Sequence, residues 1–319
     1  MMIPFTHYSV TELKHLTGGI PVSPILPYSE LPSTLAIFNE NRGHLSLSGA
    51  QSKFSVVVRN GTFRLTEAGE QGTHILKPRL SDFENAEASP ANEHLTMQIA
   101  SRVYGIETAD NALCFFGSGE PAYITRRYDV RPDGSKIQQE DFASLAGITA
   151  DTFGKDYKYN ALSYEEIGEL IRKYLPAASV EVVRFFDLIL FNFLFSNGDA
   201  HLKNFSVLMT RDGDYKLAPA YDLINTRLHL PDDGIFALRK GLFKDGRTSP
   251  LGVGGKDFMD FACRLGIPEK IAHREMNRFC ADYPEIEIMI KDSYLPEPLK
   301  ETYYQSYRTR LVSFLRVLG

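Results

Sequence analysis

The segment NGDAHLKN, residues 197–204, holds an acid and an amide whose spacing suits chemistry on a hydroxyl group. Asp199 and Asn204 lie five positions apart, between an apolar helical stretch and a predicted strand. In a kinase catalytic loop with this spacing, the carboxylate accepts the substrate hydroxyl proton and the amide oxygen binds magnesium. Ordinary surface loops also contain Asp and Asn, so the spacing alone leaves both interpretations open. We expect His201 to pack under the loop and support its backbone.

A second acidic residue fits the same chemistry. Asp222 lies 23 residues beyond Asp199, in the segment APAYD that follows a predicted β-hairpin. Magnesium prefers hard oxygen ligands and is usually held by one or two carboxylates together with substrate phosphates. Asp222 is therefore a candidate magnesium ligand. The alternative is that it caps the N-terminus of a following helix.

Two residues upstream could bind and orient phosphates. Lys77 ends a predicted strand, and Glu93 lies in the next predicted helix. Kinases pair a strand lysine with a helix glutamate, and the lysine contacts the α- and β-phosphates of ATP. The alternatives are an exposed lysine at a strand end and a first-turn glutamate that stabilises the helix dipole.

The segment SLSGAQSK, residues 46–53, could form a phosphate-binding loop through its backbone amides. It contains one glycine, Gly49. It matches neither the GxxxxGK[ST] pattern of a P-loop nor the GxGxxG pattern of a dinucleotide-binding fold, which argues against both of these classes.

Local patterns predict the elements that would position these residues. The first part of the chain is rich in short strands, including a hairpin around Asn60 and Gly61. Strands are expected at 55–58, 62–65, 74–77, 112–116 and 122–125, and a helix with apolar residues at helical spacing is expected over 92–104.

The character of the sequence changes near residue 126, after which helices dominate. Ser163 and Glu166 have capping-box spacing at the start of a helix that extends to about residue 175. Further helices are expected at 180–196 and within 255–318, with strands at 205–209 and 215–218. The order predicts a two-lobed α+β fold with a β-rich lobe at 1–126, including an extended lead-in at 1–43, and a helical lobe at 127–319.

Composition excludes several classes of protein. The net charge of -5 and the pI of about 5.9 argue against direct binding of nucleic acid or of an anionic membrane. The most apolar stretch, residues 185–195, is shorter than the roughly 20 residues needed to span a bilayer, and the N-terminus does not resemble a signal peptide. The three cysteines, Cys114, Cys263 and Cys280, lie in apolar stretches and are expected to be reduced core residues. We expect a cytoplasmic protein.

Seven short motifs occur in the order found in HipA-family toxin kinases. They are LSLSGAQSKF, HILKP, NEH, RRYD, QQEDF, NGDAHLKNFSVL and APAYDL. Over about 45–230 the sequence thus resembles the HipA family, and the helical C-terminal part is compatible with it. The resemblance implies a protein-kinase-like fold and ATP- and Mg²⁺-dependent phosphorylation of a protein serine. Family members phosphorylate aminoacyl-tRNA synthetases, which stalls translation.

The resemblance also implies a role for individual residues. Asp199 would be the catalytic base, Asn204 and Asp222 the magnesium ligands, and Lys77, supported by Glu93, a ligand of the ATP phosphates. Further ATP contacts would come from the loop residues Ser48, Gly49 and Ala50, and from a hinge at Arg126, Arg127 and Tyr128 whose backbone receives adenine. Gln139, Glu140 and Asp141 match a family motif near the site. We expect Gln139, Asp141 and His201 to support the site from around it.

The chain departs from full-length HipA proteins because only about 45 residues precede its Ser–Gly loop. In this it resembles the shorter HipT type, whose missing N-terminal piece is a separate small protein. The resemblance implies a HipB-like helix-turn-helix antitoxin and a small HipS-like protein as partners. Ser46 corresponds to the serine that HipA kinases autophosphorylate, and the pair of Ser46 and Ser48 resembles HipT, so autophosphorylation of this loop is expected to regulate the protein.

Two other functions are compatible with parts of the sequence. NGDAHLKN also resembles the HGDxHxxN loop of antibiotic phosphotransferases, which would make the protein a small-molecule phosphotransferase. Those enzymes lack the LSLSGAQ and QQED elements. A pseudokinase or corepressor that only binds a repressor is the non-enzymatic alternative, and the presence of Lys77, Asp199, Asn204 and Asp222 argues against it.

Overall fold

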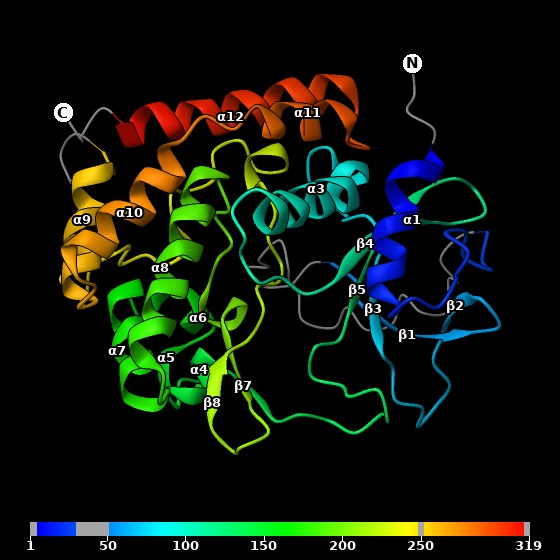
Figure 1. Cartoon of the computed structure of the whole chain (residues 1–319), viewed down its shortest axis with the longest axis horizontal. Coiled ribbons are helices and arrows are strands. Elements are labelled where there is room, and N and C mark those ends of the chain that lie inside the picture. Colours follow the sequence, from blue (N-terminus) through cyan, green and yellow to red (C-terminus); the bar gives the residue numbers. More distant parts are fainter. Residues whose placement is uncertain (1–4, 30–50, 248–251, 316–319) are drawn as a thin grey trace.

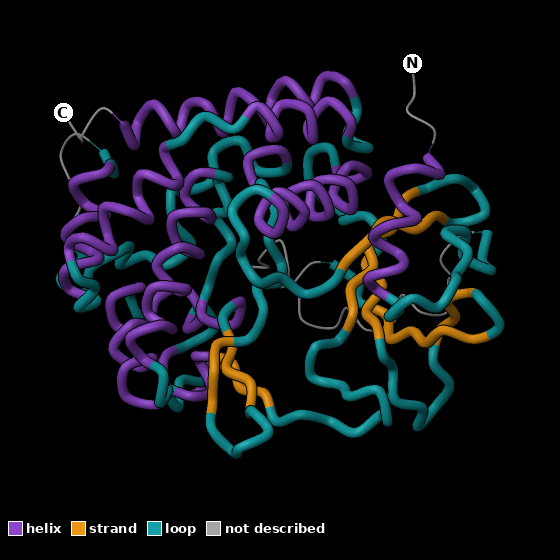
Figure 2. The backbone as a smooth tube through the Cα atoms, in the orientation of Figure 1, coloured by secondary structure: helices purple, strands orange, loops and turns teal. Residues whose placement is uncertain are grey.

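The computed structural model describes residues 5–29, 51–247 and 252–315 and shows two lobes (Figure 1). One lobe is built on a five-stranded antiparallel sheet, and the other consists mostly of helices (Figure 2). The predicted two-lobed α+β fold is confirmed. The lobe boundary near residue 126 stays a prediction.

The sheet of the first lobe has the strand order β2-β1-β3-β5-β4. Its strands are β1 (Phe54–Arg59), β2 (Thr62–Leu65), β3 (His74–Lys77), β4 (Asn111–Phe115) and β5 (Pro121–Arg126). Asn60 and Gly61 have φ angles of 51° and 70°, as a type I′ turn requires, so the predicted hairpin between β1 and β2 is confirmed. β3 pairs with β1 on one side and β5 on the other, which fixes the position of Lys77 at its end.

The predicted extended lead-in is wrong for residues 5–16, which form a helix. Helix α1 (Phe5–Leu16) packs on β4, and its Leu13 and Leu16 are buried in the core of the first lobe. The local pattern was weak because the helix is stabilised by this tertiary packing rather than by its own sequence.

Within the described part of the lead-in, residues 20–29 are extended, and we call them the strap. The amide of Leu26 donates to the carbonyl of Phe115, and the amide of Phe115 donates to the carbonyl of Pro24. The strap therefore pairs with β4, the edge strand of the sheet, in a short parallel bridge.

Helix α3 (Ser89–Arg102) lies between the sheet and the helical lobe (Figure 1). It packs on β4 and β5 and also contacts α11 (Pro284–Asp292) of the other lobe. Residues 89–100 are all buried, and Pro90 near its start suits the first turn of a helix. This burial holds Glu93 in a fixed position beside the end of β3.

The second lobe is assembled around the apolar helix α8 (Ala178–Leu194), whose aromatic side chains are buried among those of the C-terminal helices. The capping box of Ser163 and Glu166 opens α7 as predicted. The other long helices are α7 (Tyr164–Tyr174), α9 (Gly255–Arg264), α10 (Glu269–Cys280), α11 and α12 (Glu297–Leu315).

A second, three-stranded sheet borders the pocket that is described in the next section. It consists of β6 (Gln139–Asp141), β7 (Ser206–Met209) and β8 (Tyr215–Leu217), in that order. The sequence predicted β7 and β8 but not β6, and it did not predict the short helices α4 (Phe142–Leu145), α5 (Ala150–Phe153) and α6 (Tyr157–Asn160). Elements of three or four residues are too short to show the repeating pattern of apolar positions from which helices and strands are predicted.

The structure bears on two expectations from the composition, which concern membrane-spanning helices and the three cysteines. Within the described residues, no helix is long and apolar enough to cross a membrane. The three cysteines are free, but only Cys114 is buried, whereas Cys263 is exposed and Cys280 is half-buried. The prediction of three core cysteines is therefore wrong for Cys263, which lies on the amphipathic helix α9.

Candidate active site

The loop between α8 and β7 holds Asp199 and Asn204 in one rigid unit. The Asn204 side-chain nitrogen donates to the Asp199 carbonyl at 3.0 Å, and the Asp199 amide donates to the Asn197 side-chain oxygen at 3.3 Å. Asp199 is only 5% exposed. Because Asn204 uses its nitrogen within the loop, its Oδ1 atom is the one oriented to serve as a ligand.

Asp222 lies opposite this loop and faces two lysines. Its carboxylate accepts a hydrogen bond from Lys53 at 3.2 Å and a second one from Lys77. The helix-cap alternative for Asp222 is wrong. The next helical turn, η4 (Thr226–Leu228), is capped by Asn225, whose side chain accepts from the amide of Arg227.

The predicted pair of Lys77 and Glu93 is present, with 2.5 Å between Nζ and Oε1. Lys77 is buried, so the exposed-lysine alternative is wrong. Helix α3 begins at Ser89 and has no acidic residue in its first turn, so the helix-dipole alternative for Glu93 is wrong too. Burial disfavours the ammonium form of Lys77, but the carboxylates of Asp222 and Glu93 outweigh it, and the pKa of Lys77 is raised. Burial raises the pKa of Glu93, and Lys77 opposes this effect. Lys77 is therefore a fixed positive charge at the site.

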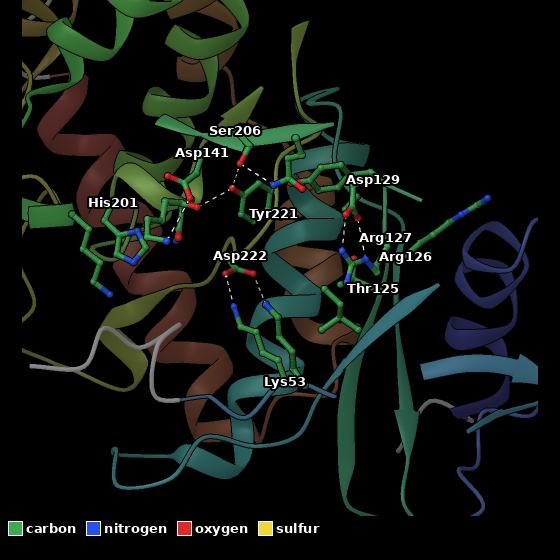
Figure 3. Close-up of a pocket in the computed structure, with 18 residues that line it drawn as sticks. Lys53, Thr125, Arg126, Arg127, Asp129, Asp141, His201, Ser206, Tyr221 and Asp222 are labelled. Atoms are coloured by element: carbon green, nitrogen blue, oxygen red, sulfur yellow. Dashed lines mark hydrogen bonds and ion pairs between the residues drawn. The ribbon is translucent and has the colours of Figure 1, made fainter. Parts of the chain in front are cut away.

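These residues surround a pocket of about 360 Å³, shown in Figure 3. That volume lies in the range typical of small-molecule sites. The pocket is lined by residues from both lobes, among them Lys53, Lys77, Arg126, Arg127, Tyr128, Gln139, Asp141, Lys158, His201, Asn204 and Asp222. Asp199 and Glu93 line a smaller adjoining pocket together with Lys77 and Asp222. The structure thus brings together every predicted site residue that it describes.

The segment 126–128 forms one wall of the pocket, where a kinase hinge would be. Two of its backbone amides are already engaged: Arg126 donates to the carbonyl of Asp110, and Arg127 donates to the carbonyl of Thr73. The Arg127 guanidinium forms two hydrogen bonds with Asp129, at 3.0 and 2.6 Å. Because the amides of Arg126 and Arg127 already have partners, the amide of Tyr128 is the candidate donor to adenine in this segment.

Three residues of the QQED motif form β6, and two of their side chains make contacts at the pocket. The Gln139 side chain donates to the hydroxyl of Ser206 on β7 at 3.1 Å. Asp141 accepts from the amide of Ser144 at 2.9 Å, which caps α4, and forms an ion pair at 3.5 Å with Lys203, in the loop between α8 and β7. The motif therefore fixes the floor of the pocket and one side of the loop.

His201 is buried beneath the loop, as expected from the sequence. Its amide donates to the Asp199 carbonyl, and its own carbonyl accepts from the Asn204 amide. Burial lowers the pKa of His201 to about 3, and Lys158 adds to this effect, so the ring is neutral at pH 7. The ring meets that of Tyr159 edge to face, with 5.2 Å between the centroids.

Sequence reasoning missed several residues at this site. Lys53 lies within the quoted motif LSLSGAQSKF, where only the serines and the backbone amides were considered. Lys158 and Tyr159 come from α6, which was not predicted. Tyr221 precedes Asp222, and its hydroxyl contacts the Ser206 hydroxyl at 2.6 Å. The predicted residues Ser46, Ser48, Gly49 and Ala50 lie outside the described residues.

The two lobes and their shared pocket define a protein-kinase-like fold. The sequence matches the HipA-like C-terminal domain family over residues 45–286, and the chain belongs to this family. Among solved structures, HipA of Shewanella oneidensis, in a complex with HipB and operator DNA, superposes with a TM-score of 0.66. It is 21% identical, and the match covers 98% of this chain and 72% of that chain.

Other relatives extend the comparison. The Helicobacter pylori proinflammatory kinase CtkA superposes with a TM-score of 0.52 at 14% identity, over 82% of this chain and 91% of that chain. In sequence, a candidate kinase of Haemophilus influenzae is 26% identical over 95% of this chain and 91% of its own length. The serine/threonine-protein kinase toxin HipA of Shewanella oneidensis is 24% identical over 86% of this chain and 64% of its own length.

Proposed function

We propose that this protein is a serine/threonine protein kinase that acts as the toxin of a type II toxin–antitoxin system. The strongest support is that side chains from four separate segments meet at one site: the Lys77–Glu93 pair, Asp222, and the loop of Asp199 and Asn204. Phosphoryl transfer from ATP needs a cation for the phosphates, oxygen ligands for magnesium and a base for the hydroxyl. Each requirement has a candidate side chain here.

In the proposed reaction, Asp199 accepts the proton of a substrate serine hydroxyl as its oxygen attacks the γ-phosphorus of ATP. ADP leaves, and Lys77 neutralises charge on its phosphates. Asn204 and Asp222 offer an amide oxygen and a carboxylate, which fit magnesium; when bound, the ion would neutralise phosphate charge. The described residues contain no cluster of three His, Cys, Asp or Glu that could hold a metal ion by itself, so binding would depend on the nucleotide.

The proposal includes self-regulation and partners. Autophosphorylation at Ser46 or Ser48 would control access to the ATP site, and the substrate would be a protein, by family resemblance an aminoacyl-tRNA synthetase. A HipB-like helix-turn-helix antitoxin is supported by the HipB present with the similar HipA structure. By the same family resemblance, a small HipS-like protein is a further proposed partner.

The test is transfer of the labelled γ-phosphate of ATP by the purified full chain. The wild-type protein with Mg²⁺ should label protein serine, either its own or that of an added aminoacyl-tRNA synthetase. The Asp199→Asn variant should lose the activity by about 10²- to 10⁴-fold, the usual contribution of a general base, and should still bind ATP. An active Asp199→Asn variant would overturn the assignment of the base.

Two other outcomes would replace the proposal. Label that appears only in an added aminoglycoside or another small molecule would indicate a small-molecule phosphotransferase. ATP binding without any turnover in the presence of Mg²⁺ would indicate a pseudokinase.

A further inference from the structure

The proposed base has a partner that no motif indicated. The Tyr159 hydroxyl donates a hydrogen bond of 2.9 Å to Oδ1 of Asp199. Hydrogen bonds to a charged group are stronger than neutral ones, and this one restrains one of the two carboxylate oxygens in a fixed direction. The hydrogen bond thereby orients the carboxylate that would receive the proton of the phosphoacceptor hydroxyl.

Tyr159 is itself firmly held. The amide of Arg239 donates to its carbonyl at 2.9 Å, and its ring packs edge to face on His201. His201 belongs to the same loop as Asp199 and is buried. The tyrosine therefore joins α6 to the catalytic loop at two points, the ring and the hydroxyl.

The neighbouring residue Lys158 lines the pocket. Its Nζ lies 5.0 Å from the centroid of the Tyr159 ring, a cation–π distance that keeps the ammonium beside the base. Burial lowers the pKa of Lys158; Asp199 opposes this effect, and Lys203 and Lys53 add to it. A half-buried ammonium with two other lysines nearby is placed where an incoming polyanion such as a nucleotide phosphate would be attracted.

Three other cations of the pocket contact carboxylates other than that of the proposed base. Lys53 and Lys77 contact Asp222, and Lys203 contacts Asp141. Lys158 lines the same pocket and lies close enough to Asp199 for the two charges to interact, where the phosphoryl group must arrive if Asp199 is the base. A cation at that point would stabilise the charge that develops during transfer.

We propose that Lys158 and Tyr159 of α6 complete the catalytic centre: Tyr159 is a positioning residue for Asp199, and Lys158 is a catalytic residue that contacts the transferring phosphoryl group. This inference rests on the proposed kinase function. In the step itself, the bond from the serine oxygen to the γ-phosphorus forms and the bond from that phosphorus to the bridging oxygen of ADP breaks. The serine proton passes to the carboxylate of Asp199, and Tyr159 keeps its own proton.

The experiment compares three full-length variants with the wild type by the rate of label transfer from [γ-³²P]ATP. Tyr159→Phe should lower kcat by roughly 10- to 100-fold, as expected for the loss of a hydrogen bond to a charged group, with KM for ATP unchanged. Lys158→Met should lower kcat by about 10²- to 10³-fold, the effect of removing one donor to a developing charge. Lys158→Arg should restore part of that loss because it keeps the charge.

Matched controls come from the same segment. Tyr157→Phe removes a hydroxyl from α6, and Lys155→Met removes an exposed lysine just before it. Both should transfer label at the wild-type rate. Calorimetry with Mg²⁺ and the non-hydrolysable analogue AMPPNP should show that Tyr159→Phe binds nucleotide as the wild type does.

Wild-type kcat in Tyr159→Phe or in Lys158→Met would overturn the corresponding role. So would equal losses of kcat and of AMPPNP affinity in Tyr159→Phe, because that pattern indicates a structural effect on the pocket. If the proposed kinase function is itself wrong, the wild-type chain will transfer no label. That result differs from a wild-type rate in the variants, and it would overturn both the proposed function and this inference.

Discussion

The side-chain nitrogen of Asn197 donates a hydrogen bond of 3.4 Å to the backbone carbonyl of Asp222. This contact ties the catalytic loop to the segment of the proposed magnesium ligand across the β7–β8 hairpin. Asp222 has a φ angle of 54°, a left-handed conformation that residues other than glycine rarely adopt. Its surroundings must therefore hold this conformation, in which the carboxylate meets Lys53 and Lys77.

Replacement of Asp222 by Asn should separate metal-dependent from metal-independent binding. The variant loses the negative charge that would hold magnesium, so affinity for MgATP should fall much more than affinity for adenosine. Calorimetry with the two ligands measures both. Equal losses would show that Asp222 shapes the pocket and does not bind the metal.

The Lys77–Glu93 pair should also matter for stability. Lys77→Met removes the buried partner of Glu93, and breaking a buried ion pair in this way costs about 3–5 kcal/mol. The double variant Lys77→Met/Glu93→Gln removes both charges and should recover most of that loss. Urea unfolding provides the free energies. If the double variant is as unstable as Lys77→Met alone, the cost does not come from the uncompensated carboxylate.

His94, next to Glu93, should make stability depend on pH. Burial lowers the pKa of His94 from 6.5 to about 3, so the unfolded chain binds a proton that the folded chain excludes. The stabilising contribution is complete above pH 6.5 and is lost as the pH falls toward 3.

The measurement compares wild type with His94→Gln by urea unfolding between pH 7 and pH 5. Well below pH 6.5 the wild-type free energy of unfolding should fall, relative to the variant, by about 1.4 kcal/mol per pH unit. His74 and His201 also have lowered pKa values but are present in both proteins, so their effects cancel. Parallel pH curves would contradict the assignment to His94.

Phosphorylation of the Ser46/Ser48 loop should inactivate the protein. A phosphate adds about -1.5 to -2 charges, which would repel the ATP phosphates and compete for Lys77. Mass spectrometry after incubation with MgATP should find phosphate at Ser46 or Ser48 in the wild type and none in Asp199→Gln. The variant Ser46→Ala/Ser48→Ala should remain active after the same incubation. Unmodified serines in an active wild-type protein would rule out this regulation.

The predictions from sequence succeeded where a residue and its role lie within one short segment. The Asn60–Gly61 turn requires a particular backbone conformation, and the Ser163–Glu166 capping box satisfies its own helix end, so both could be found locally. Lys77, Glu93 and Asp222 lie far apart in the sequence. Their proximity could be predicted only because the order of the motifs resembles that of a known family.

Contacts that depend on tertiary packing were missed. Tyr159 reaches Asp199 from a four-residue helix 40 positions earlier, and nothing in its local sequence distinguishes it from Tyr157. Helix α1 was hidden for a related reason, because its apolar residues gain stability only against β4. The function of the QQED motif became clear only once β6 was seen beside β7.

The strap also affects how the protein behaves in a crowded solution. A bare edge strand presents unpaired amides and carbonyls that recruit other chains into intermolecular sheets. Here the main chain of residues 24–26 occupies that edge at Phe115. Loss of residues 20–29 by proteolysis would uncover β4 at Phe115 and add a second open edge, beside that of β2, at which other chains could pair.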